Sequence, residues 1–230
     1  MTAPAIALHA SATDPAAEMW FAEPSGFTAL PLDALLPVPG TAAAGDLRIA
    51  FSPLLDAAPD ERVRQEFIAQ FAKAQQLLAA IREVGTVHCS IGLHRNDVGD
   101  ADACGGQPLV SWLTISWRDT AVASRAATAA RAAMATGHGH VEYRELPCGP
   151  AGFSEATVTA SVGTGLPEQP LLQIHGYLPH PDCKRLAVLT LSTVALACRE
   201  QYRTLLHQIA ETITFENPLQ APPPPGRKTS

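Results

Sequence analysis

The chain has 230 residues, a formal net charge of −6 and a hydrophobic fraction of 47%. This length and composition fit one large globular domain and exclude a chain that is disordered throughout, because the apolar residues suffice for a core. The acidic balance argues against nucleic acid as the partner, since the 16 basic residues are spread along the chain and form no cluster.

Both ends of the chain are expected to lie outside the folded domain. Residues 1–18 are mostly small and lack the basic and apolar regions of a secretion signal, so they are predicted to be a flexible leader. Residues 217–230 include a run of four prolines and are predicted to be an extended, disordered tail. No stretch has the roughly 20 apolar residues of a membrane helix. We therefore predict a cytoplasmic protein without membrane insertion, with a single domain at residues 19–216.

The number and spacing of the cysteines fit the predicted cytoplasmic location. They are five in number, an odd count, and no two of them have the close spacing of a paired motif. Reduced thiols are therefore expected in place of a disulfide framework. The residues are Cys89, Cys104, Cys148, Cys183 and Cys198.

The first part of the domain is predicted to contain an irregular segment, a linker and one long helix. Residues 19–36 carry aromatic side chains around turn-forming residues and are expected to anchor to the core, and residues 37–45 are predicted as a linker. A helix that covers one face of a sheet is predicted from Pro59 to Gly85, because acidic residues follow Pro59 and apolar residues recur every three or four positions. These apolar positions are Val63, Phe67, Phe71, Ala74, Leu78 and Ile81.

The middle of the chain alternates strands and a helix. Residues 87–93 alternate apolar and polar side chains and predict a strand, which is followed by an acidic loop at residues 96–107. The next strand, residues 109–117, is interpreted as apolar on both faces and therefore central. An alanine-rich helix is predicted at residues 120–136, since alanine has the highest helix propensity. A short strand at residues 141–146 and a turn at residues 148–152 follow.

The last third of the chain predicts an antiparallel meander followed by a helix. Alternation at residues 155–162, with Glu155 on the polar side, and further strands at residues 172–178 and 186–191 indicate three hairpin-connected strands. An amphipathic helix is expected at residues 194–212. The fold class is therefore α+β: a single α/β/α sandwich with a central, mainly antiparallel sheet, two major packed helices and an alanine-rich helix.

One hypothesis for a functional site is a metal centre in two loops. His138 and His140 form one close pair, and His180 and Cys183 form another. Zinc is usually held by four such nitrogen or sulfur ligands, delivered in pairs. The spacing matches no known zinc motif, and ordinary turn residues explain these side chains more simply. We therefore predict no metal and no other cofactor, and we keep the four residues as candidates only.

Other candidate chemistry is weaker. A nucleophilic cysteine needs a neighbouring base and a positive environment, whereas Cys104 lies among aspartates, and Cys89 is predicted to face the core. No catalytic residue is therefore assigned. His88 and His94 share the polar face of one strand, and with Arg95 they are the candidates for lining a ligand cleft.

Two segments carry a resemblance to a known family. The last strand, KRLAVLTLST at residues 184–193, runs into a helix that ends at Ile213, Thr214 and Phe215, and this resembles the end of PsbP-like α/β/α sandwich proteins. Trp20 with Phe21, followed by the Pro24 segment, is similar to the opening of actinobacterial members. The resemblance implies a non-catalytic module that binds a partner or assists assembly. The secreted members carry a signal and a lipobox cysteine, which this sequence lacks.

The sequence thus favours a non-catalytic, cytoplasmic interaction or accessory protein whose partner is another protein. Two alternatives remain open: binding of a small molecule or lipid in the cleft between sheet and helix, and a metal- or thiol-dependent hydrolase. A protein-binding module should expose an apolar patch larger than a few hundred Å². A ligand-binding protein should instead have a cleft of roughly 300–1,000 Å³ with convergent polar groups.

Overall fold

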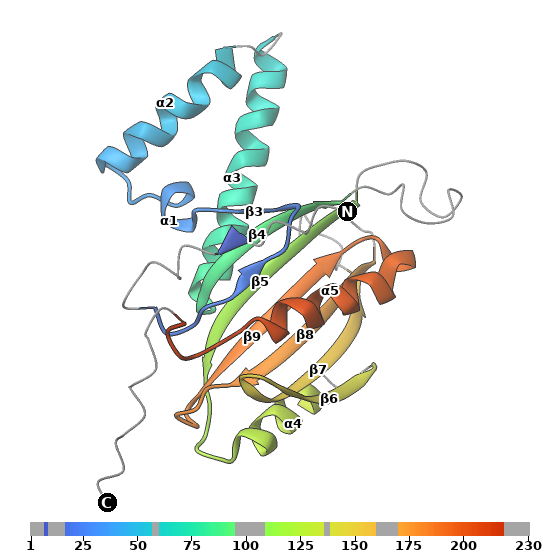
Figure 1. Ribbon diagram of the computed structural model, residues 1–230. Coiled ribbons are helices and arrows are strands. Elements are labelled where there is room, and N and C mark those ends of the chain that lie inside the picture. Colours follow the sequence, from blue (N-terminus) through green and yellow to red (C-terminus); the bar gives the residue numbers. More distant parts are fainter. Residues whose placement is uncertain are drawn as a thin grey trace, which may run out of the picture.

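Seven strands form one antiparallel sheet, and helices pack on both of its faces (Figure 1). The computed structural model describes residues 7–8, 17–56, 60–94, 109–135, 139–159 and 170–218. The predicted α+β class with an antiparallel sheet is confirmed. In the described part of the chain, no helix has both the length and the apolar character needed to cross a membrane.

The strands are β1 (Ala7–Leu8), β2 (Ala22–Glu23), β3 (Phe27–Ala29), β4 (Thr86–His94), β5 (Leu109–Asp119), β6 (Val141–Leu146), β7 (Gly149–Val158), β8 (Leu171–Pro179) and β9 (Arg185–Thr193). The helices are α1 (Leu32–Leu35), α2 (Ala42–Asp56), α3 (Glu61–Glu83), α4 (Arg125–Ala135), the short 3-10 helix η2 (Leu196–Cys198) and α5 (Arg199–Glu211). β1 and β2 form a small separate pair, and the large sheet has the order β3-β4-β5-β9-β8-β7-β6.

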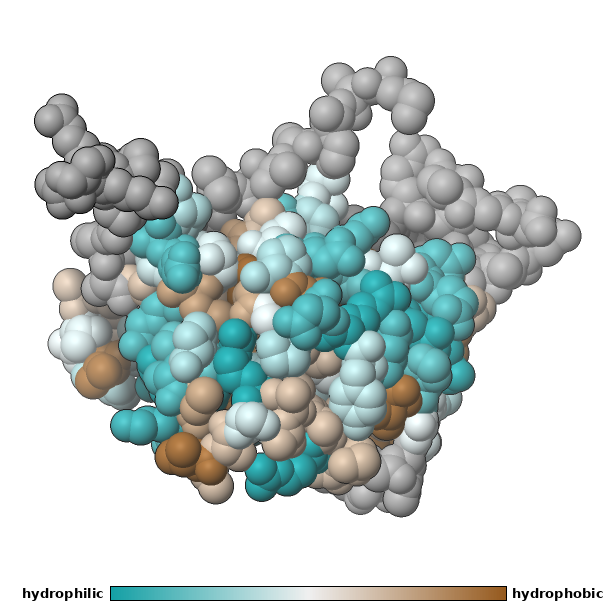
Figure 2. Space-filling view, turned by 60° about the horizontal axis from the view of Figure 1, so that its bottom comes forward, coloured by the Kyte–Doolittle hydropathy of each residue, from teal (hydrophilic) through white to brown (hydrophobic). Residues whose placement is uncertain are grey.

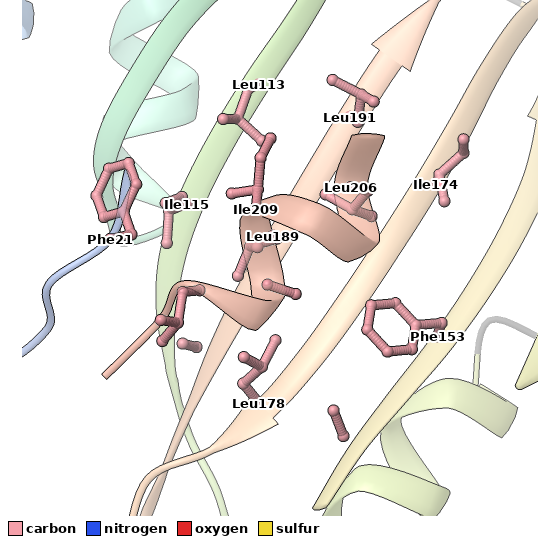
Figure 3. Packing of buried hydrophobic residues seen from close by; sticks show 14 of the residues in the cluster. Phe21, Leu113, Ile115, Phe153, Ile174, Leu178, Leu189, Leu191, Leu206 and Ile209 are labelled. Carbon is pink, nitrogen blue, oxygen red and sulfur yellow. The ribbon is translucent and has the colours of Figure 1, made fainter. Parts of the chain in front are cut away.

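The main core lies between the sheet and α5. Alternate residues of the central strands β5 and β9, including Leu113, Ile115 and Leu189, point toward this helix and are fully buried (Figure 3). Leu206 and Ile209 of α5 fill the space above them. Each such side chain contributes about 1.5–3 kcal/mol when it leaves water, so this layer holds the sheet and the last helix together. We call this side of the sheet the α5 face.

The opposite side of the sheet, the α4 face, is covered by α4 over strands β6, β7 and β8. The helix comes unusually close at Gly152, where a methyl group would lie 2.6 Å from the carbonyl oxygen of Ala129 and 3.0 Å from Cβ of Ala133. Small side chains on both elements therefore permit this packing. This explains the alanine-rich composition of the predicted second helix.

The long first helix is confirmed as α3. The Asp60 carboxylate accepts a hydrogen bond from the backbone N–H of Val63 at 2.9 Å, which caps the first turn, and Gly85 has a φ of +82° just after the last turn. The C-terminal part of α3 lies against β4, while its N-terminal part and α2 extend beyond the sheet (Figure 1). The side chains of the apolar stripe from Phe67 to Ile81 lie outside the described residues.

The structure corrects three local predictions. The predicted linker at residues 37–45 runs into α2, which the pattern hid because Gly45 and Pro53 both disfavour a helix interior. The predicted turn at residues 148–152 belongs to β7, because β6 and β7 form a tight hairpin in which Leu146 pairs with Gly149. The strand at residues 109–117 is only partly apolar on the face opposite α5, since Thr114 and Ser116 lie there together with Val110 and Trp112.

We expect Gly152→Ala to lower the free energy of unfolding by about 1–3 kcal/mol, because the added methyl group pushes α4 away from the sheet. Gly45→Ala is the matched control: nothing lies within 4 Å of that position in α2, and alanine favours a helix. Urea unfolding of both variants measures the effect. An unchanged midpoint for Gly152→Ala would contradict the close packing of α4.

Candidate functional site

An open groove on the α4 face is the candidate for a functional site. It has a volume of about 440 Å³ and lies over the middle of the sheet, between α4 and the residue that follows α3. The lining residues are Val84, Thr86, Thr114, Ser116, Arg118, Ala132, Ala135, His175, Tyr177, Leu186, Val188 and Thr190. We call this site the hydroxyl groove, because threonine, serine and tyrosine side chains form much of its floor.

The register of the sheet brings the polar floor together from four strands. Thr114 of β5 pairs with Thr190 of β9, and Thr190 pairs with His175 of β8. One row further along, Thr86 of β4 pairs with Ser116 of β5. Cross-strand partners on one face lie about 4.5–5.5 Å apart, so these side chains form one continuous polar surface.

Several of these hydroxyl groups are available to a ligand. The side chains of Thr86, Thr114 and Ser116 form no hydrogen bond with any other residue in the described part of the chain. A polar group that is largely removed from bulk solvent needs a partner, from the protein, from water or from a ligand. The groove therefore offers hydrogen bonds that the protein itself does not use.

His175 is the imidazole of the groove. Its Nδ1 lies 3.0 Å from the Thr190 hydroxyl oxygen, and this contact fixes the ring and leaves Nε2 as its second polar atom. Burial lowers the pKa of His175 below its ordinary value, because removal from water disfavours the charged form. The ring is therefore neutral at pH 7 and able both to donate and to accept a hydrogen bond.

Arg118 is the charged residue of the groove. Its side chain is exposed at the end where β5 pairs with Leu186 of β9. Within the described ranges, no carboxylate forms an ion pair with Arg118 and no carboxylate lines the groove. The guanidinium group is therefore free to bind an anion.

A second group of charges has a structural role. The Glu155 carboxylate, predicted on a solvated face, is only 8% exposed on the α5 face, where Arg203 of α5 donates a hydrogen bond to it at 2.7 Å. Arg199 lies 3.4 Å from its other oxygen. This pairing compensates the buried charge and ties α5 to β7. The alternation of polar and apolar residues on β7 did not predict this burial, because a buried, paired carboxylate and a solvated carboxylate give the same sequence pattern.

The described residues of the metal hypothesis, His140 on one side and His180 with Cys183 on the other, lie at opposite ends of β7 and β8. His180 and Cys183 form the β8–β9 turn, where the Cys183 N–H donates to the His180 carbonyl at 3.0 Å. The His140 carbonyl instead accepts from the N–H of Glu155. Gly152 of β7 pairs with Tyr177 of β8, so the β8–β9 turn lies near the start of β7, whereas His140 lies beside Glu155. The two sites are therefore separated by about six residues of β7, or about 20 Å.

This separation prevents a shared metal site, since zinc–ligand bonds are only about 2.0–2.3 Å long. His138 lies outside the described residues, and within them no group of three or more His, Cys, Asp or Glu side chains is placed to hold a metal ion. The His180 ring instead packs edge-on against Trp117 and Phe215 and contacts Asp182 at 2.9 Å. These contacts stabilise the turn.

Among the predicted cleft residues His88, His94 and Arg95, the structure describes the side chain of His88. His88 is only 5% exposed, with its Nε2 3.1 Å from a Glu23 carboxylate oxygen and its ring edge-on to Phe21. The N-terminal segment thus covers this face of β4, and His88 lines no open cleft. The His94 side chain and all of Arg95 lie outside the described residues.

The described cysteines offer no activated thiol in the groove. Cys89 is fully buried, and burial raises the pKa of its thiol to about 12. Burial also raises the pKa of Cys148. Both groups therefore remain protonated at pH 7, which removes their nucleophilic form. Cys104 lies outside the described residues.

Comparisons with known proteins add no assignment to this geometry. The chain matches no protein-family model, and neither curated proteins nor solved structures contain a significant match. The resemblance to PsbP-like proteins therefore stays a prediction that depends on the two ends of the sequence.

Stability should depend on the protonation of His175. Because its pKa is lowered in the folded state, the unfolded chain takes up this proton first as the pH falls below about 6.5, the ordinary histidine value. The contribution of His175 to the free energy of unfolding is therefore complete above that pH and is lost below it. Urea unfolding at pH 7.5 and 5.5 should show a smaller loss of stability for His175→Gln than for the wild type.

The exposed His140 supplies the control, because its side chain is solvated in both the folded and the unfolded state. His140→Gln should retain the wild-type loss of stability between the two pH values. If His175→Gln also retains the full loss, the imidazole is not buried as described.

Proposed function

We propose that this protein is a non-catalytic, cytoplasmic binding protein that holds a small molecule in the hydroxyl groove. The observation that carries this proposal is a groove of about 440 Å³ that combines a neutral imidazole with hydroxyl groups and a guanidinium group that have no partner among the described residues. Small-molecule sites typically measure about 300–1,000 Å³ and combine apolar walls with a few polar groups that orient the ligand. The groove meets both conditions.

The composition of the groove favours binding over catalysis. Acid–base and nucleophilic mechanisms require a proton-transferring group next to a second reactive group. Among the described residues of the groove, His175 is paired with the hydroxyl of Thr190, and no carboxylate or thiol accompanies it. This arrangement orients a ligand by hydrogen bonding without activating a nucleophile.

The face drawn in Figure 2 gives less support to a large protein interface. In the view of Figure 2, hydrophobic residues lie in small groups separated by hydrophilic ones. A protein-binding face would instead gather its apolar residues into one broad patch. The small-molecule alternative therefore takes precedence over the accessory role that the sequence favours.

Binding of a partner protein is the second candidate function, and the position of α2 supports it. This helix extends beyond the sheet (Figure 1), and its Ile49 side chain is 67% exposed. Val38, in the segment leading to α2, is 68% exposed. Exposed apolar side chains on a projecting helix are a usual feature of helix-mediated recognition. An accessory role of this kind agrees with what the PsbP-like resemblance implies.

Native mass spectrometry of protein purified from its own host tests the proposal. We expect a small molecule bound at one equivalent, and we expect Ala135→Trp to lose it because the indole fills the groove from the α4 side. Met134→Trp is the matched control, since Met134 is 58% exposed and does not line the groove. Retention by Met134→Trp and loss by Ala135→Trp is the expected pattern.

Two results would contradict the proposal. A small molecule retained equally by both variants would place the binding site elsewhere. A stoichiometric partner protein without any small molecule would favour the second candidate function, and Ile49→Asp should then abolish the co-purification.

A further inference from the structure

The two ends of the hydroxyl groove differ in chemistry. Arg118 supplies a positive charge at one end, and Thr114, Thr190 and His175 supply neutral polar groups at the other. Thr114 and Arg118 are four residues apart on β5, which corresponds to about 13 Å along the strand. A ligand that spans the groove therefore meets a cation at one end and hydrogen-bonding groups at the other.

The middle of the groove is mainly apolar along its walls. Val188 of β9 lies on the floor between the two ends, beside Ser116 and Tyr177, and Leu186 lies next to Arg118. Ala132 of α4 and Val84 form the sides. Leu186 and Val188 are buried or half-buried under this helix. The apolar walls favour a ligand whose central part is a short hydrocarbon, because binding removes its apolar surface from water.

The charged end favours a carboxylate. Arg118 is the one charged side chain among the described residues that line the groove, and a guanidinium group binds a carboxylate through two parallel hydrogen bonds. Phosphate sites usually add free backbone N–H groups at a helix N-terminus. Here the floor consists of strands whose backbone groups pair within the sheet.

The other end favours a neutral group. A second charge there would lose its water without gaining an opposite charge, which is unfavourable. Thr114, Thr190 and the neutral imidazole of His175 can instead donate to and accept from a hydroxyl or amide. The polar groups at the two ends therefore select different parts of one ligand.

We infer that the ligand of the hydroxyl groove is a small carboxylic acid with a neutral hydrogen-bonding group at the far end of a short apolar spacer. The carboxylate binds Arg118, the spacer lies against Leu186 and Val188, and the neutral group binds the hydroxyls of Thr114 and Thr190. This inference rests on the proposed function, since it names the ligand class of the same groove.

Isothermal titration calorimetry with three matched probes tests the inference on the full chain. The probes are 8-hydroxyoctanoate, octanoate, which lacks the hydroxyl group, and 1,8-octanediol, which lacks the carboxylate. We expect the hydroxy acid to bind the wild type at least about tenfold more tightly than the diol, the usual scale for a charge-assisted hydrogen bond. Octanoate should also bind more weakly than the hydroxy acid.

Two variants separate the ends of the groove. Arg118→Gln should abolish the preference for the hydroxy acid over the diol, whereas Arg131→Gln, which removes an exposed arginine of α4 outside the groove, should keep it. Thr190→Val should weaken the binding of the hydroxy acid and leave the binding of octanoate unchanged. Thermal unfolding of each variant verifies that the fold is intact.

Three outcomes would overturn the inference. Equal binding of the acid and the diol would show that the groove takes neutral ligands, and the proposed function would stand. Tighter binding of octyl phosphate than of the hydroxy acid would show that the groove prefers a phosphate ester to a carboxylate. Failure of all probes, while Ala135→Trp still loses a native ligand, would reject this ligand class alone; if no native ligand exists, the proposed function fails as well.

Discussion

The rest of the structure depends on the two-sided character of β5 and β9, the central strands of the sheet. Alternate residues of these strands, such as Leu113 and Leu191, are fully buried under α5. The residues between them include Thr114, Ser116 and Thr190, which face the other side. Because successive side chains of a strand point to opposite faces, one pair of strands supplies both the hydrophobic layer and the polar floor of the groove.

The helices fix the extent of that polar floor. The α5 face is closed by a complete hydrophobic layer, and the charged pair of Glu155 and Arg203 adds a specific link at its edge. On the other face, the close approach of α4 at Gly152 keeps the helix over β7 and β8. The middle of the sheet therefore remains accessible between α4 and Val84. A helix centred over β5 and β9 would cover the hydroxyl groups and remove the site.

Sequence patterns predicted the elements of the fold better than the site. Alternation located the strands because one face of each is buried, and Gly85 marked the end of the long helix. The helix at residues 42–56 was missed because Gly45 and Pro53 disfavour a helix interior. The groove could not be predicted from any single segment, because it depends on the register that pairs Thr86 with Ser116 and Thr114 with Thr190 across three strands. The hydroxyl residues at alternate positions of β5 and β9 were the available signal, and their meaning depends on which face a helix leaves open.

A crystal structure of the protein purified from its own host tests the central claim most directly. The account predicts electron density for one small molecule in the hydroxyl groove, with an acidic group at Arg118 and a polar group beside Thr190 and His175. It also predicts that Leu113 and Leu191 remain covered by α5. A groove that contains only water, or a β5–β9 register that turns the hydroxyl groups toward α5, would contradict the account.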